Sequence, residues 1–304
     1  MGHDHAHGHA GTNRARLVIA IAIIGTFLVV EVVGALLAGS LALLADAGHM
    51  VSDLLGLVIA LVALGIAARP ATDRQTFGFQ RAEVLGALAN GVLLSVVAIV
   101  VAVQGVTRLI EPGGHEVLGV PMLVVAVLGL GANVVVLFIL RGGARESIGM
   151  RGAYLEVLGD MFGSVAAIIA GVVILATGFQ QADAIASLVI AGLIIPRAFS
   201  LLRDVVHVLT EAVPSHMSVA EIREHLRDTP GVVDVHDVHV WAITSGAPVF
   251  TAHVVVTNDL FERGGAPALL DELGRCLGDH FDVEHSTFQL EPVGHAEQEE
   301  HAHR

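Results

Sequence analysis

Residues 45–53 read Ala45-Asp46-Ala47-Gly48-His49-Met50-Val51-Ser52-Asp53 and lie inside an otherwise apolar run from Leu41 to Ala68. His49 and Asp53 are four residues apart, so on a helix their side chains lie on one face, about one turn from each other. Ionisable groups in such a run are costly, and they persist where they pair, face water or bind an ion. The stretch therefore predicts a functional site inside a membrane-spanning helix.

A second stretch, Ala153-Tyr154-Leu155-Glu156-Val157-Leu158-Gly159-Asp160, repeats this spacing near the start of another apolar run. Two such faces brought together supply one imidazole and three carboxylates, which suffice for a tetrahedral divalent ion such as zinc. We therefore predict that the cation ligands are His49, Asp53, Glu156 and Asp160. The alternative is two unrelated pairs, one of them salt-bridged to an arginine, but we expect no arginine at mid-span.

The composition is that of a membrane protein with a soluble part. Hydrophobic residues make up 54% of the 304 residues and charged residues 15%, and the mean hydropathy is +0.73. The net charge of -14 argues against nucleic acid as a partner, and 17 histidines suit a protein that handles cations. A single cysteine, Cys276, excludes an intramolecular disulfide framework.

Six apolar runs are each long enough to cross a hydrocarbon core of roughly 30 Å. They cover about residues 16–38, 41–68, 84–108, 118–140, 153–178 and 183–205. We therefore predict a six-helix transmembrane domain over residues 16–208, embedded in the lipid bilayer as a multi-pass protein of the inner (plasma) membrane.

The connecting segments predict the orientation of this domain. The segments before the first run, between the second and third, and between the fourth and fifth contain Arg14, Arg16, Arg69, Arg74, Arg81, Arg141, Arg145 and Arg151. The opposite connections contain almost only Arg108. The positive-inside rule then places both termini in the cytoplasm.

The composition changes after Pro214. Residues 218–228 are typical of an amphipathic helix, in which Ser218 and Glu221 form a capping box. Strand patterns cover 232–243, 248–257 and 283–291, and a second helix pattern covers 267–280. Residues 209–292 thus predict a cytoplasmic αββαβ domain of the α+β class.

The two ends of the chain are predicted to be disordered, at residues 1–15 and 293–304. The first tail contains His3, His5, His7 and His9, and it is either a solvated tail or a weak collector of metal ions.

Other polar residues inside the apolar runs allow more than one interpretation. Glu31 is either part of a proton relay or a partner of an arginine near the cytoplasmic side. Asp46, one turn before His49, suits a supporting or entry role more than direct ligation. For Asn90 and Asn133 we favour hydrogen bonds between helices over metal contact.

Four stretches together resemble the cation diffusion facilitator family, in its zinc-transporter branch, over nearly the whole chain. They are Ser40 to Asp53, Phe77 to Leu88, Glu156 to Asp160, and Val235-His236-Asp237-Val238-His239-Val240-Trp241. The resemblance implies a homodimeric six-helix transporter with a cytoplasmic metal-binding domain, which exports Zn²⁺ or a related ion in exchange for protons and contributes to metal homeostasis and resistance.

In the soluble domain, the resemblance places metal ligands at His236, His253, His285 and Glu291, so that zinc is both substrate and regulatory ligand. His285 and Glu291 are an even number of residues apart and face the same side of a regular strand. His239 is three residues from His236, which predicts the opposite face and a core or interface role. The alternative is a purely structural role for these histidines. If they do bind metal, we hypothesise that an imidazole from the N-terminal tail of the partner subunit completes the ligand shell.

One position departs from the family pattern. Many zinc-selective members have histidine where this chain has Glu156, and a carboxylate there makes the site harder and more tolerant of manganese, cobalt or iron. One alternative function is therefore export of manganese, cobalt, iron or cadmium by the same mechanism. The other alternative function is a membrane metal sensor or scaffold that moves no ion. A membrane metalloprotease is excluded because its HExxH motif is lacking, so the chain is not predicted to be an enzyme.

Overall fold

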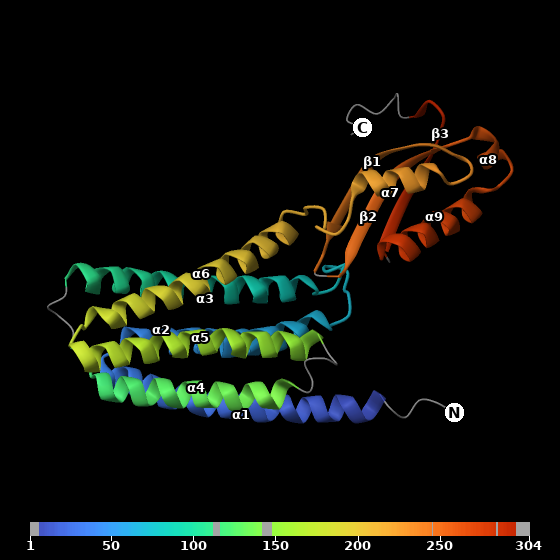
Figure 1. Cartoon of the computed structure of the whole chain (residues 1–304). Coiled ribbons are helices and arrows are strands. Elements are labelled where there is room, and N and C mark those ends of the chain that lie inside the picture. The colour runs from blue at the N-terminus through green and yellow to red at the C-terminus, as the bar shows by residue number, and fades with distance from the viewer. Residues whose placement is uncertain (1–5, 112–115, 142–147, 245, 284, 296–304) are drawn as a thin grey trace. The chain divides into compact units, whose positions relative to one another are not determined.

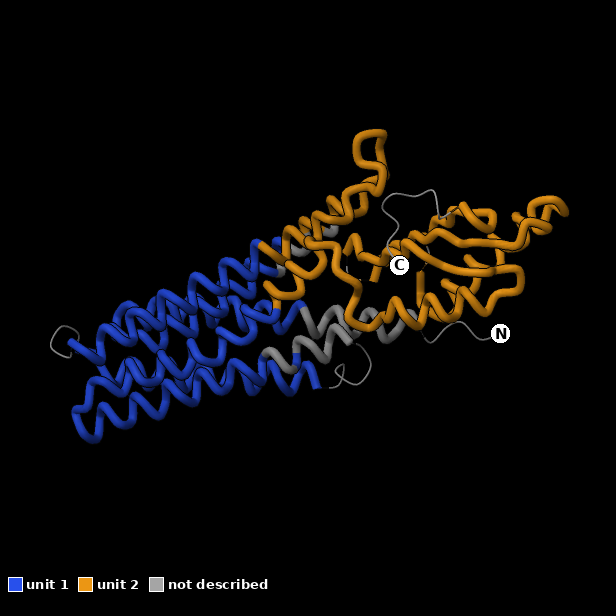
Figure 2. The backbone as a smooth tube through the Cα atoms, turned by 90° about the horizontal axis from the view of Figure 1, so that it is seen from above, with its two compact units in different colours: residues 1–59, 89–200 blue, residues 60–88, 201–304 orange. Residues whose placement is uncertain are grey.

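The computed structural model describes residues 6–111, 116–141, 148–244, 246–283 and 285–295, and within helices the side chains of residues 6–17, 57, 60, 61, 64, 148–153, 155 and 156 are outside this description. The chain forms two compact units, Met1–Ile59 with Ala89–Ser200, and Ala60–Leu88 with Leu201–Arg304 (Figure 2). Of the tails predicted at 1–15 and 293–304, residues 1–5 and 296–304 lie outside the described residues, whereas residues 6–15 are helical, against the prediction of disorder.

Six long helices occupy the first two thirds of the chain (Figure 1). They are α1 (Ala6–Ala38), α2 (Leu41–Ala67), α3 (Arg81–Ile110), α4 (Gly119–Arg141), α5 (Ile148–Thr177) and α6 (Gln181–Leu209). Among the described residues, all of these except α2 contain a stretch long and apolar enough to cross a membrane. The 27-residue α2 has the length for a sixth span. The six predicted runs are therefore helices, although α1 begins earlier than predicted, at Ala6.

Small residues leave room for polar side chains between the helices. At Gly163 of α5, an added Cβ atom would lie 2.5 Å from the Asp46 Oδ1 atom of α2. At Gly56 of α2, an added Cβ atom would lie 2.6 Å from the Asn90 Nδ2 atom of α3. Small residues are common at the contacts between membrane helices. The Asp46 side chain of α2 therefore contacts α5 at the place where Gly163 has no side chain.

The start of α2 is capped by a carboxylate from another helix. Asp183 of α6 is 1% exposed and accepts hydrogen bonds from the backbone N–H groups of Leu41 at 2.7 Å and Ala42 at 3.1 Å, and from the Ser40 hydroxyl. Arg108 of α3 donates to the same carboxylate at 3.2 Å. A carboxylate satisfies the unpaired N–H groups at a helix N-terminus and is stabilised there by the helix dipole.

We expect Asp183→Ala to lower the free energy of unfolding by about 3–5 kcal/mol, because it removes the charge partner of the partly buried Arg108 and the acceptor of the first N–H groups of α2. Among the described residues, Arg108 would keep only its hydrogen bond to the Gly39 carbonyl. Thermal unfolding of the full chain in detergent measures this, with the exposed Asp204→Ala on the same helix as the control. Asp183→Asn keeps one acceptor and should unfold between the wild type and Asp183→Ala. Equal stability of the Asp183 and Asp204 variants would contradict the role of the cap.

The C-terminal domain consists of α7 (Val219–Arg227), β1 (Val232–Ala242), β2 (Pro248–Val256), a short α8 (Asn258–Glu262), α9 (Ala266–Phe281) and β3 (His285–Pro292). The predicted αββαβ order is confirmed, with α8 as an addition. Ser218 is the N-cap of α7 and accepts a hydrogen bond from the Glu221 N–H at 3.4 Å, as predicted.

The sheet has the order β1-β2-β3, in which β1 and β2 are antiparallel and β2 and β3 are parallel. Residues Phe250, Ala252 and Val254 of β2 are buried in the core with side chains of α7 and α9 (Figure 1). Because side chains alternate along a strand, His253 lies on the face that these helices do not cover. The chemistry of this domain is therefore on the sheet face away from its helices.

A β-bulge in β1 changes which residues share that face. Asp237 has a φ of 50°, and the register shifts between His236, which pairs with His253, and His239, which pairs with Thr251. A bulge adds one residue to a strand, so side chains three positions apart return to the same side. The prediction that His239 faces away from His236 is therefore wrong. His239 is exposed rather than part of the core.

Candidate metal sites

Helices α2 and α5 bring three of the four predicted membrane ligands together. The His49 Nε2 atom lies 3.4 Å from Asp53 Oδ2 and 3.5 Å from Asp160 Oδ1. One ligand atom from each residue falls within 4.8 Å of the others. His49 and Asp160 are buried, and Asp53 is partly buried. One nitrogen and two carboxylate oxygens at this separation form a pocket that a divalent ion fits.

The fourth predicted ligand belongs to the same helix as Asp160. Glu156 is in α5, one turn before Asp160, but its side chain lies outside the described part of the structure. Its role as a ligand stays a prediction. Beside the cluster is a cavity of about 500 Å³, lined by Asp46, His49, Asp160 and Arg197 among others. The cavity therefore borders the side chains of His49 and Asp160.

An arginine stands at this cluster, against expectation. Arg197 of α6 places its Nη1 atom 3.4 Å from His49 Nε2 and 3.7 Å from Asp53 Oδ2. The expectation that no arginine lies near mid-span is therefore wrong. The sequence did indicate a functional role for Arg197, because a charged residue inside the sixth apolar run is as costly as one inside the second run.

Two further carboxyl groups are buried behind the cluster. Glu31 of α1 is 1% exposed and Asp46 of α2 is 2% exposed, and their side chains share a hydrogen bond. Among the described residues, the Glu31 Oε2 atom has no hydrogen-bond partner. Glu31 is thus beside Asp46 rather than beside a cytoplasmic-side arginine, and Asp46 lines the cavity next to the ligands.

A second cluster takes one residue from each strand of the cytoplasmic domain. Glu291 of β3 places Oε2 3.1 Å from His236 Nε2 and Oε1 2.7 Å from His253 Nδ1. The two imidazole ring centroids are 5.2 Å apart. Glu291 is 1% exposed and His236 6% exposed. Three of the four residues predicted from the family resemblance are therefore brought together.

The donor set of this cluster fits a zinc ion. Two imidazole nitrogens and a carboxylate oxygen are common zinc ligands, and a fourth position is left for water or another residue. The His236 Nδ1 atom is buried and has no hydrogen-bond partner among the described residues. A buried carboxylate between two imidazoles is costly unless a proton or a metal ion balances its charge.

His285 is not part of this cluster. It pairs with Val249 at the start of β3, whereas His253 pairs with Gln289 near the strand's other end. Six residues separate His285 from Glu291, which is roughly 20 Å along a strand. The prediction that His285 and Glu291 face the same side of β3 is correct, but the two residues lie at opposite ends of the strand. The His285 ring instead contacts Phe77, with centroids 5.3 Å apart.

Two residues near the cytoplasmic cluster were not predicted. Gln289 donates a hydrogen bond from Nε2 to Glu291 Oε1 at 2.8 Å and so orients that carboxylate. Asp237, in the bulge, places Oδ2 3.9 Å from His253 Nε2 and Oδ1 3.4 Å from His239 Nε2. The signal for Asp237 was a carboxylate inside a strand, a position this residue type disfavours.

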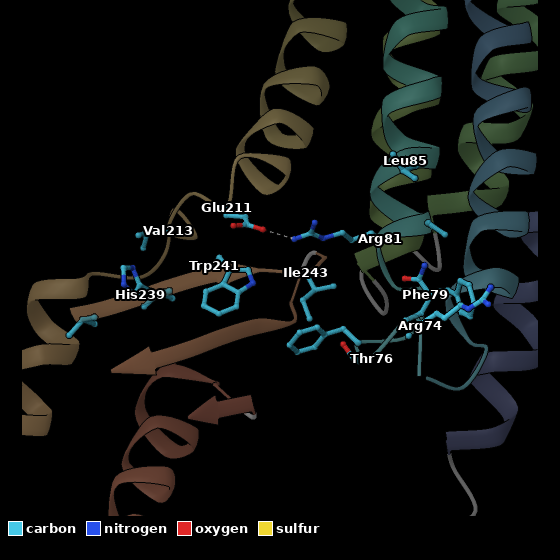
Figure 3. Close-up of a pocket in the computed structure, with 16 residues that line it drawn as sticks. Arg74, Thr76, Phe79, Arg81, Leu85, Glu211, Val213, His239, Trp241 and Ile243 are labelled. Carbon is cyan, nitrogen blue, oxygen red and sulfur yellow. Dashed lines mark hydrogen bonds and ion pairs between the residues drawn. The ribbon is translucent and has the colours of Figure 1, made fainter. Parts of the chain in front are cut away.

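The larger cavity of the second unit, about 770 Å³, is of a different kind. It is lined by the 74–85 segment and by β1, including Trp241, and Arg81 donates to Glu211 across it at 2.9 Å (Figure 3). The lining residues include one histidine, His239, and no cluster with metal-ligand geometry among the described side chains. Neither metal-ligand cluster of the described residues is part of this lining, although His239 contacts Asp237 beside the His236, His253 and Glu291 cluster.

A bundle of membrane-length helices around a His/Asp cluster, joined to an α+β domain with a His/His/Glu cluster, defines a metal-handling multi-pass membrane protein. Comparison with known proteins specifies it further. Residues 17–210 match the family described as cation efflux transmembrane domain, and residues 214–293 match the cation efflux protein, cytoplasmic domain. The chain belongs to the cation efflux family, which consists of metal transporters and not of enzymes. The predicted family resemblance is confirmed.

Several relatives match over nearly their whole length. The chain is 42% identical to the metal cation efflux system protein CzcD of Cupriavidus metallidurans over 99% of this chain and 94% of that protein. It is 40% identical to the zinc transporter ZitB of Escherichia coli, over 96% of this chain and 93% of that protein. It is 36% identical to the cadmium, cobalt and zinc/H(+)-K(+) antiporter of Bacillus velezensis, over 97% of this chain and 93% of that protein.

A solved structure, the metal-bound C-terminal domain of the CzcD transporter, is 39% identical over 25% of this chain and 99% of that chain, with a TM-score of 0.23.

Proposed function

We propose that this protein is a divalent-cation:proton antiporter that exports zinc from the cytoplasm. The observation that carries the proposal is the His49, Asp53 and Asp160 cluster, which two helices of a membrane domain hold beside a cavity. Relatives named as zinc transporters and as a cadmium, cobalt and zinc antiporter support the substrate class and the exchange. The arginine distribution supports cytoplasmic termini in the inner membrane.

Competition for the same ligand atoms couples the two ions. A carboxylate or imidazole that binds a metal ion must first release its proton, so binding of one ion drives off the other. If the helix bundle exposes the site alternately to the two sides, metal leaves outward and protons return inward. Glu156 completes the ligand shell in this proposal, since it is one turn from Asp160 on the same helix.

The cytoplasmic domain would hold a second zinc ion at His236, His253 and Glu291. A bound ion would link all three strands and neutralise the buried Glu291 carboxylate. We further propose that the chain functions as a homodimer joined through these domains. The cytoplasmic-domain family match supports this.

Proton-driven uptake into inside-out vesicles tests the transport proposal. Zinc, manganese, cobalt and cadmium are supplied outside, and an acidic interior provides the gradient. We expect zinc uptake that stops when an ionophore collapses the gradient. Saturable binding without uptake would contradict transport and favour a sensor or scaffold.

Glu156→His is expected to shift selectivity toward zinc. An imidazole in place of a carboxylate makes the donor set softer, so the ratio of zinc to manganese uptake should rise about 10-fold. The ratio of initial rates measures the effect, and Glu156→Gln is the control that removes the charge without adding a nitrogen ligand. If manganese, cobalt, iron or cadmium is the main substrate, the wild type will prefer that ion. An unchanged ratio in Glu156→His would exclude Glu156 from the site.

A further inference from the structure

Arg197 contacts two of the three clustered ligand groups in the membrane domain. Its Nη1 atom lies 3.4 Å from His49 Nε2 and 3.7 Å from Asp53 Oδ2. A guanidinium group has only donors, so in the His49 tautomer that leaves Nε2 unprotonated, a hydrogen bond from Arg197 uses the Nε2 lone pair that a metal ion needs. The ion pair with Asp53 engages a carboxylate oxygen of the same cluster. Arg197 and a metal ion therefore compete for the His49 Nε2 lone pair and for the negative charge of Asp53.

The charge of the cluster explains why a cation is held there. Asp53 and Asp160 belong to the cluster, and the buried carboxyl groups of Asp46 and Glu31 lie behind it. Several carboxyl groups in one site repel one another unless a positive charge or protons balance them. An arginine keeps its proton at every physiological pH, so its positive charge is permanent. Arg197 thus supplies one of the two positive charges that a divalent ion supplies when it is bound.

The surroundings of Arg197 also allow its side chain to move away from His49 and Asp53. Its side chain is 45% exposed and lines the cavity of about 500 Å³, so packing does not lock it in place. Pro196, the preceding residue, lies inside α6. Proline cannot donate the backbone hydrogen bond to the fourth residue before it, and helices bend at such positions. The turn that carries Arg197 is therefore less restrained than a regular turn.

We propose that Arg197 is a tethered counter-ion of the metal-free transport site, and that an entering divalent cation displaces it from His49 and Asp53. This inference rests on the proposed transport function of the same cluster. Arg197 is a positioning residue in this scheme. It weakens metal binding because the metal must displace it, and it speeds metal release because it returns to the vacated ligands.

Uptake kinetics in inside-out vesicles test this role. Arg197→Gln removes the competing charge, and we expect its KM for zinc and cadmium to fall about 10-fold and its maximal rate to fall with it. Arg197→Lys keeps a positive charge and should remain near the wild type. Arg203→Gln, an exposed arginine of the same helix, is the matched control and should change neither constant.

Chemical rescue separates displacement from a structural role. In Arg197→Ala, millimolar guanidinium ion should refill the position and raise the lowered KM again, whereas the same concentration of urea should not. Asp53→Ala is assayed in parallel. If Asp53→Ala transports normally, the proposed site itself fails. If Asp53→Ala is inactive while Arg197→Gln has an unchanged or raised KM, or guanidinium has no effect, the displacement proposal is overturned and the site stands.

Discussion

Asp53→Ala is expected to abolish proton-driven zinc uptake, with a loss of at least about 100-fold, since removal of even the residues that orient metal ligands costs 10–100-fold. Asp53 is within 3.4 Å of His49 and 3.7 Å of Arg197, so the change also leaves the Arg197 guanidinium without its ion-pair partner in the cluster. The measurement is the initial rate of uptake into inside-out vesicles that contain equal amounts of protein.

Asp73→Ala is the matched control for this experiment. Asp73 is an exposed aspartate between α2 and α3 and has no part in the cluster, so its variant should transport like the wild type. Asp53→Glu lengthens the side chain by one methylene group and should retain partial activity if the carboxylate itself is required. Normal uptake by Asp53→Ala would show that the transport site lies elsewhere.

Glu291→Gln is expected to remove the zinc site of the cytoplasmic domain. Glu291 contacts both imidazoles of the cluster through its two oxygens and is 1% exposed. The amide has the same shape but offers one neutral oxygen, so zinc affinity should fall about 100-fold. Zinc binding to the full chain is measured by competition with a chelating dye, in the Asp53→Ala background so that the membrane cluster does not contribute.

Glu262→Gln, an exposed glutamate of α8, is the control for this change. Because the histidine-bearing tails are the same in both proteins, the difference between them isolates the cluster. One fewer tightly bound zinc ion per chain in Glu291→Gln supports the site. An equal number of bound ions in the two variants would assign the cytoplasmic cluster a structural role only.

The cluster in the membrane domain could be predicted because helix geometry is simple. A spacing of four residues puts two side chains on one helix face in any context, and this holds for His49 and Asp53. The recurrence of the spacing at Glu156 and Asp160 predicted that α5 faces α2 there, and Asp160 does lie beside His49. Arg197 was missed because it comes from a third helix, and no local pattern links α6 to α2.

The residues of the cluster in the C-terminal domain were harder to predict. Alternation along a strand tells which side of the sheet a residue faces, but not which residues of the neighbouring strand lie beside it. His285 shares a face with Glu291 yet lies six residues away along β3. Register is decided by pairing between strands, and β3 pairs with β2 in parallel after a long connection. The bulge at Asp237 is a local change of register that alternation alone does not reveal.

The cap at Asp183 ties the N-terminus of α2 to α6, so this end of α2 is the point about which the helix would tilt. Because α6 binds the N-terminus of α2 there, a tilt of α2 about this point moves each residue in proportion to its distance from Leu41. With a rise of 1.5 Å per residue, His49 is roughly 12 Å from Leu41 and Ala67 roughly 39 Å. In a tilt about this point, the far end of the helix would therefore move about three times as far as His49.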